Sequence, residues 1–405
     1  MKRDLKVAEA LMDVKVGLDG VIKALGGIPR HPKTIVTYQD GSVVEYDISG
    51  TLEKEQIASM EDAVKIDIGT QITGIGEHGL YQSENLIELT IPSTVTNIES
   101  TSIASCPGLK RIIIDLCNKI YDSRDNCNAI IKTADNELIF GCENTIIPNS
   151  VTSIGSIAFY NCSGLTSIII PNSVTSIGSS AFSGCSGLTF VTIPDSVTII
   201  GNNAFSGCSG LTSIAIPSSI TSIGSGVFSD CSGLTSIIIP NSVISIGDSA
   251  FNGCSGLTSV TIPDSVTSIG NNVFSGCSGL TSVTIPDSVT SIGEWTFQYC
   301  FVLTSVTIPS SVTRIGSGMF YYCYGLTSVT IPSSVTSIGG NTFQGCSELT
   351  SITIPSSITS IGSYAFYNCP ATVTFEGRNK ATVQGMVNYR WSIGTNKIVC
   401  IDGTL

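Results

Sequence analysis

The chain has 405 residues, of which only 12% are charged, and 31 acidic against 19 basic side chains give a formal net charge of −12. An acidic chain poor in Lys and Arg is a poor partner for phosphate backbones, which excludes nucleic acid as an expected ligand. No run of roughly 18 apolar residues is present, so no membrane insertion is expected. The two histidines leave little material for hydrolytic chemistry.

Residues 1–33 are predicted to form an N-terminal amphipathic helix. Within residues 5–25 the apolar side chains follow an unbroken heptad spacing, and they are Val7, Leu11, Val14, Leu18, Val21 and Leu25. Gly26 and Gly27 end the pattern. Two interpretations stay open: the helix packs on its own chain, or it forms a short parallel coiled coil of three or four strands that makes a homo-oligomer through residues 5–25.

Residues 34–67 are predicted to form a β-hairpin cap. The segment 34–50, TIVTYQDGSVVEYDISG, alternates apolar and polar residues on both sides of Asp40-Gly41. Because Asp-Gly tolerates the positive φ angles of a type I′ turn, we expect the chain to reverse there. The hairpin would cover the exposed edge of the first coil of the repeat that follows.

Residues 68–375 are a tandem repeat. The pair Ile-Pro recurs at a constant spacing from Ile147 through Ile170 to Ile354, within the pattern I-P-x-S-V-T-S-I-G-x-x-A-F-x-G-C-S-G-L-T-S-V-T. Two diverged units begin at Ile68 and Ile91. A third begins at Ile114, which lies more than one period before Ile147 and so carries an insertion, placed at about 116–146.

Each repeat is predicted to be one coil of a leucine-rich-repeat solenoid, of α/β type. Leu165-x-x-Ile168-x-Ile170 predicts a short parallel strand that Pro171 ends, since proline cannot donate to a ladder. Val174 and Ile177 predict a second short strand, and Ala181, Phe182 and Cys185 predict one inward-facing helical turn. Because no unit can bury its own apolar residues, the coils must stack, giving a right-handed superhelix of about 13 coils.

Most of the 15 cysteines share one position of the repeat. Eleven are Cys106 and then one in every unit from Cys162 to Cys369, and parallel inward-facing thiols are poorly oriented for disulfides. The sequence has no C-x-x-C motif and no histidine after His78, so we expect no metal, no cofactor and no catalytic centre. Cys127 and Cys142 could pair across the inserted hairpin in an oxidising compartment.

Aromatic residues replace the usual Ser and Gly in two adjacent coils. They are Trp295, Tyr299, Phe301, Tyr321, Tyr322 and Tyr324. The repeat period predicts that Tyr299 stacks on Tyr322 and Phe301 on Tyr324. Clustered aromatics with a polar atom are typical interface anchors, so these six are candidate partner-binding residues. The alternatives are divergent packing or a contact with the C-terminal segment.

A second candidate surface is the strand face, whose outward positions are almost all Thr and Ser. These residues are typical of β-strands, and a flat hydroxyl surface could also bind a glycan. Residues 376–405 are predicted to be a C-terminal cap or tail, with two short strands around Trp391 and Cys400.

The units 262–284 and 331–353 resemble the BspA-like leucine-rich repeats of bacterial surface proteins. The insertion from Tyr121 to Cys142 resembles the hairpin-bearing unit found inside such arrays, and the resemblance covers roughly 68–375. It implies adhesion to host proteins or other cells, without catalysis.

The leading hypothesis is therefore a non-catalytic adhesion or interaction module that binds a protein or glycan partner at a bacterial surface or extracellularly. Asp4, Glu9 and Asp13 interrupt the apolar core that a secretory signal needs. The alternative is a tail-fibre-like structural component of a phage or prophage particle, which would use the N-terminal heptads to oligomerise.

Overall fold

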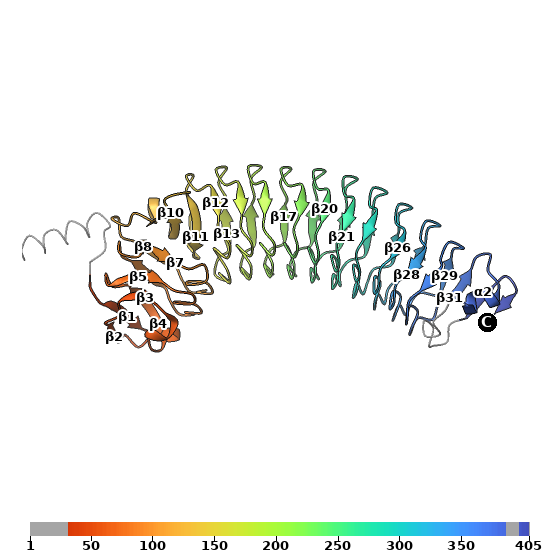
Figure 1. Ribbon diagram of the computed structural model, residues 1–405, viewed down its shortest axis with the longest axis horizontal. Helices are drawn as coiled ribbons and strands as arrows, with labels where there is room; N and C mark the ends of the chain where they lie inside the picture. The colour runs from red at the N-terminus through yellow and green to blue at the C-terminus, as the bar shows by residue number, and fades with distance from the viewer. Residues whose placement is uncertain (1–30, 386–396, 405) are drawn as a thin grey trace, which may run out of the picture. The chain divides into compact units, whose positions relative to one another are not determined.

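The computed structural model describes residues 31–385 and 397–404. The chain divides into two compact units, residues 1–164 and 165–405, and each is described by itself (Figure 1). The predicted helix over residues 5–25 and the strand expected around Trp391 lie outside the described residues.

The first unit begins with the predicted β-hairpin. β1 (Thr34–Tyr38) pairs antiparallel with β2 (Val43–Tyr46), and on its other side β1 pairs antiparallel with β4 (Ala63–Asp67). β1 thus lies between β2 and the strand that directly precedes residue 68. The predicted type I′ turn is wrong: only Gly41 has a positive φ, +82°, whereas that turn needs one at Asp40 as well. The Asp40 carboxylate instead accepts the Ser42 N–H at 2.8 Å.

The array begins before residue 68. β3 (Gly50–Leu52) pairs in parallel with β5 (Ile72–Ile75), and β5 with β7 (Asn97–Ile98). β4 pairs in parallel with β6 (Glu88–Ile91), and β6 with β8 (Arg111–Ile114). Residues 50–67 therefore form a coil of the solenoid. They lack the Ile-Pro signature and contain two short 3₁₀ turns, η1 (Lys54–Gln56) and η2 (Met60–Asp62), which is why the repeat pattern does not reveal them.

The insertion forms a small antiparallel hairpin, as predicted. β10 (Ala129–Lys132) pairs with β9 (Tyr121–Asp122) and with β11 (Glu137–Gly141), and a 3₁₀ turn, η3, spans Arg124–Asn126. β11 then pairs in parallel with β12 (Ser153–Ile154), which returns the chain to the solenoid. Cys127 and Cys142 are buried free thiols. The Cys142 thiol donates to the Asn128 carbonyl at 3.3 Å.

The second unit is a stack of coils with two short strands each, and most of these strands pair in parallel register with the matching strand of the next coil (Figure 1). The longer strands are β13 (Ser167–Ile169), β15 (Phe190–Thr192), β17 (Ser213–Ala215), β19 (Ser236–Ile238), β21 (Ser259–Thr261), β23 (Ser282–Thr284), β25 (Ser305–Thr307), β27 (Ser328–Thr330), β29 (Ser351–Ile354) and β31 (Thr372–Phe375). The two-residue strands are β14 (Ser176–Ile177), β16 (Ile199–Ile200), β18 (Ser222–Ile223), β20 (Ser245–Ile246), β22 (Ser268–Ile269), β24 (Ser291–Ile292), β26 (Arg314–Ile315), β28 (Ser337–Ile338) and β30 (Ser360–Ile361). The unit closes with the helix α2 (Lys380–Gly385) and with β32 (Ile398–Cys400) and β33 (Gly403–Thr404).

The predicted helical turn is wrong. Ser180 and Gly184 have φ angles of 54° and 76°, which a right-handed helix does not allow. The N–H groups of Ser180, Phe182 and Gly184 donate to carbonyls of the next coil at 2.9, 2.7 and 2.7 Å. On the third side of each coil, backbone hydrogen bonds therefore join the turns of one coil to the turns of the next. The solenoid has about 15 turns of about 23 residues rather than 13.

Two columns of side chains fill the core of the second unit. The phenylalanines from Phe182 to Phe366, one in each coil, are fully buried and stack face to face with centroid distances of 5.2–5.8 Å. Beside them, the cysteine thiols donate to the phenylalanine carbonyl of the preceding coil, as from Cys254 to Phe228 at 3.1 Å. This confirms the prediction of a buried column of free thiols.

Burial should make the thiol column unreactive in the folded protein. It raises the pKa of Cys231 and of Cys277 to about 12, so little of the nucleophilic thiolate exists at pH 8. Of the 15 cysteines only Cys117 is exposed. We expect a thiol-specific dye to modify Cys117 rapidly and the column only after denaturation. Bridges between neighbouring coils, found by mass spectrometry without reductant, would contradict the arrangement.

Candidate functional site

The six predicted aromatic residues lie on the turns of two adjacent coils. Trp295, Tyr299 and Phe301 lie between β24 and β25, and Tyr321, Tyr322 and Tyr324 lie between β26 and β27. The ladder between coils holds them in register: the Tyr299 N–H donates to the Tyr321 carbonyl at 2.8 Å, and the Tyr322 N–H donates to the Gln344 carbonyl at 2.8 Å.

The six rings form one continuous cluster. Tyr299 stacks on Tyr322 with centroids 6.0 Å apart and an interplanar angle of 10°, and Phe301 stacks on Tyr324 at 5.4 Å and 18°. Both predicted stacks are thereby confirmed. Tyr321 joins the two coils by edge-to-face contacts with Trp295 at 5.5 Å and Tyr299 at 5.7 Å, and it contacts Tyr322 of its own coil at 4.4 Å.

Three of the six aromatic residues occupy backbone positions that usually favour glycine or asparagine. Trp295, Tyr299 and Tyr322 have φ angles of 59°, 59° and 55°. Each side chain leans toward the following coil: the Trp295 ring covers Gly318, and the Tyr322 ring covers Gly345 with its Cδ1 2.5 Å from where a Cβ would be. The glycines thus make room for the rings.

Part of the cluster faces solvent. Tyr299 is 38% exposed, Phe301 40% and Tyr324 45%, so no described segment of the chain covers them. Val302 beside them is 45% exposed. Tyr321 lies deeper, and desolvation together with the neighbouring tyrosines raises the pKa of its phenol. The cluster therefore presents neutral aromatic rings with hydroxyl groups, a composition typical of interface anchors.

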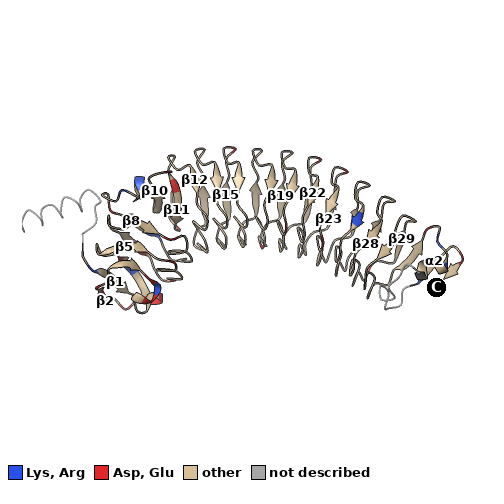
Figure 2. Ribbon diagram, viewed as in Figure 1, with Lys and Arg blue, Asp and Glu red and all other residues tan. Residues whose placement is uncertain are grey.

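The cluster lies in a nearly uncharged part of the molecule. In Figure 2 most charged residues colour the coils before residue 165, whereas the array beyond is almost entirely tan. One of the few charged residues of that array is Arg314 on β26. Arg314 forms an ion pair with Glu294 at 3.2 Å, and the Ser317 hydroxyl donates to the same carboxylate at 3.3 Å. Among the described residues this is the only ion pair beside the aromatic cluster, and its two charges neutralise each other.

On the strand face, threonine hydroxyl groups form hydrogen bonds between neighbouring coils. The Thr189 hydroxyl donates to the Thr166 carbonyl at 3.1 Å, Thr235 to Thr212 at 3.2 Å and Thr281 to Thr258 at 3.0 Å. These threonine hydroxyl groups therefore link each of these coils to the preceding one. Phe190 and Ile238 interrupt this face and are 56% and 77% exposed.

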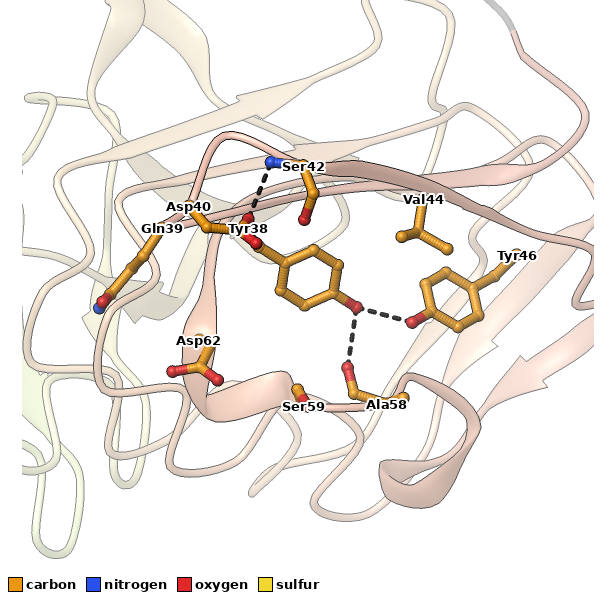
Figure 3. Close-up of a pocket in the computed structure, with 9 residues that line it drawn as sticks. All are labelled: Tyr38, Gln39, Asp40, Ser42, Val44, Tyr46, Ala58, Ser59 and Asp62. Carbon is orange, nitrogen blue, oxygen red and sulfur yellow. Dashed lines mark hydrogen bonds between the residues drawn. The ribbon is translucent and has the colours of Figure 1, made fainter.

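A pocket of about 680 Å³ lies at the N-terminal hairpin, where Asp40 and Asp62 line it (Figure 3). The Tyr38 hydroxyl lies 2.6 Å from the Tyr46 hydroxyl and donates to the Ala58 carbonyl at 2.8 Å. Burial and the Tyr46 contact raise the pKa of Tyr38 far above its usual range. Because its partners are a phenol and a carbonyl rather than a base, Tyr38 is a structural residue.

The described residues contain no group of three or more His, Cys, Asp or Glu side chains that could hold a metal ion. Over the same ranges, none of the helices is both long and apolar enough to span a membrane.

The family model described as the BspA type leucine rich repeat region (6 copies) matches residues 51–131, 139–258 and 245–373. Among curated proteins no significant match was found. A leucine-rich repeat protein from Bacteroides ovatus is 26% identical in sequence, with 92% of this chain and 99% of that chain covered and a TM-score of 0.55. One from Eubacterium ventriosum is 22% identical, covering 86% and 96% of the two chains with a TM-score of 0.52.

Proposed function

Because the chain belongs to the BspA-type leucine-rich repeat family, we propose that it is a non-catalytic adhesion module that binds a protein or glycan partner at a bacterial surface or extracellularly. Proteins of this family are typically bacterial cell-surface proteins and serve as interaction modules. The alternative of a phage fibre component depends on residues 5–25, which lie outside the described residues.

The aromatic cluster carries the proposal. Elsewhere in the array the positions of Tyr299 and Phe301 hold small residues, as at Gly276 and Ser278 one coil earlier. Three of the six aromatic side chains are more than a third exposed and touch one another, so they form an apolar surface that soluble proteins rarely leave without a partner. No described segment of the chain covers these three residues, which favours binding over internal packing.

Removing the aromatic cluster should abolish binding and leave folding intact. The positive φ of Tyr299 and Tyr322 favours asparagine there, as the array itself has at Asn161 and Asn368. We therefore choose the triple variant Y299N/Y322N/Y324S. We expect its attachment to bacterial and epithelial cells to fall at least about tenfold, since each lost anchor costs more than about 1 kcal/mol. Flow cytometry with the labelled protein measures this.

The matched control is Tyr364→Asn, which makes the same replacement at a φ of 58° outside the aromatic cluster. Its attachment should equal that of the wild type. The melting temperature of the triple variant should change by a few degrees at most, because the replaced side chains are partly exposed. A large fall in the melting temperature would assign the cluster to packing, and unchanged attachment would refute its role in binding.

A further inference from the structure

The ring of Tyr299 has one covered face and one open face. Its stacking partner Tyr322 lies in the following coil, so the other face is directed toward the preceding coil. There the corresponding residue is Gly276, and the nearest atoms to the position that a Cβ on Gly276 would take are backbone atoms of Gly253, Cα at 3.5 Å and N at 3.6 Å. Apart from the chain neighbours of Gly276, no side chain of the described residues therefore lies within 4 Å of that position.

A single carboxylate bounds this space on its far side. Asp230 occupies the same repeat position as Gly253 and Gly276, two coils before Gly276, and its Oδ1 lies over Gly253. Asp230 is exposed, and its second oxygen accepts the Ser229 hydroxyl at 3.3 Å. With coils spaced about 4.8 Å apart, the gap between the carboxylate over Gly253 and the Tyr299 ring is about 10 Å wide. Ser255 and Ser278, beside the two glycines, add hydroxyl groups.

We infer that this gap, named here the Gly276 gap and bounded by Asp230, Gly253, Gly276 and Tyr299, binds a sugar ring of a neutral glycan. The inference rests on the proposed function and specifies its ligand. The C–H groups on one face of a pyranose are attracted by the negative face of an aromatic ring. A carboxylate accepts hydrogen bonds from two neighbouring hydroxyl groups.

Charge argues against an acidic ligand. An acidic sugar would be repelled by Asp230, and Arg314 on β26 is already paired with Glu294. An apolar peptide would leave the Asp230 carboxylate and the serine hydroxyl groups without hydrogen-bond partners. A neutral sugar matches the open ring face, the serine hydroxyl groups and the Asp230 carboxylate together.

The test uses affinity gel electrophoresis of the full chain in gels containing dextran, laminarin, mannan or galactan, with the acidic polymer polygalacturonate as a further arm. We expect at least one neutral polysaccharide to retard the wild type, and polygalacturonate not to. Filling the gap with Gly276→Asn should abolish retardation, because the new side chain would lean onto Tyr299. Tyr299→Asn should weaken retardation at least about tenfold.

Matched controls separate binding from folding. Gly184→Asn makes the same change in the same column at a φ of 76°, and its side chain would lean over Gly207, away from both Asp230 and the aromatic rings. It should be retarded like the wild type. Asp230→Gly should weaken retardation, whereas Asp264→Ser, which removes an exposed charge elsewhere, should not.

The inference is overturned if no neutral polysaccharide retards the wild type, if only polygalacturonate does, or if Gly276→Asn is retarded normally. If cell attachment still depends on the aromatic cluster in that case, the proposed function stands and its partner is a protein. If the triple variant attaches normally to cells, the proposed function itself fails.

Discussion

We expect the protein to unfold between about pH 9 and pH 11 under reducing conditions, because its buried thiols cannot ionise in the folded state. Burial raises the pKa of Cys369 to about 11 and of Cys231 and Cys277 to about 12, and it raises that of Cys208, Cys254, Cys300, Cys323 and Cys346 well above the ordinary value of 9.0. In the unfolded chain these groups ionise near pH 9.

The free energy of unfolding decreases with rising pH because the folded and unfolded states bind different numbers of protons. Below about pH 8 the thiols are protonated in both states, so the free energy of unfolding does not depend on them. Above pH 9 the unfolded state loses protons that the folded state keeps, and each thiol then lowers the free energy of unfolding by about 1.4 kcal/mol per pH unit. Together the eight thiols lower the free energy of unfolding by on the order of 10 kcal/mol at pH 10, which equals the total stability of many domains.

Urea denaturation at pH 7.5, 9 and 10, followed by circular dichroism with reductant present, measures this loss. The matched variant replaces Cys254, Cys277 and Cys300 with alanine. Its free energy of unfolding should fall less steeply above pH 9, by about 4 kcal/mol per pH unit. Equal stability of the wild type at pH 7.5 and pH 10 would show that the thiols are not buried.

Truncating the phenylalanine column at Phe251→Ala should lower the free energy of unfolding by about 3–5 kcal/mol. Phe251 is 0% exposed and stacks between Phe228 and Phe274, with centroids 5.6 Å from each. Because both neighbouring coils are held by their own hydrogen bonds, they cannot collapse into the cavity. The same denaturation experiment at pH 7.5 measures the effect.

The chain supplies a control for this substitution. Phe190→Ala removes the same atoms from a side chain that is 56% exposed on the strand face, and it should change the free energy of unfolding by less than about 0.5 kcal/mol. If Phe251→Ala costs under about 1 kcal/mol, the column is not the packing spine of the solenoid.

The repeat period alone determined which side chains are neighbours in space. When coils stack in parallel register, one position of the repeat becomes one column, so the phenylalanine and cysteine columns and the stacks of Tyr299 on Tyr322 and Phe301 on Tyr324 follow from counting residues. The same counting fails where the signature residues are absent. The coil containing β3 and β4 lacks Ile-Pro and was recognisable only by its pairing with β5 and β6.

Only the tertiary structure decided the features that depend on hydrogen bonds and contacts with neighbouring coils. The spacing of Ala181, Phe182 and Cys185 fits a helical turn, but the N–H groups of Ser180, Phe182 and Gly184 find acceptors in the next coil, and no local pattern reveals that choice. Likewise, the sequence places Tyr299 in a cluster without showing which face of its ring is free. That face is open because side chains at this position lean toward the following coil, and Gly276, which precedes Tyr299, has no side chain to cover it.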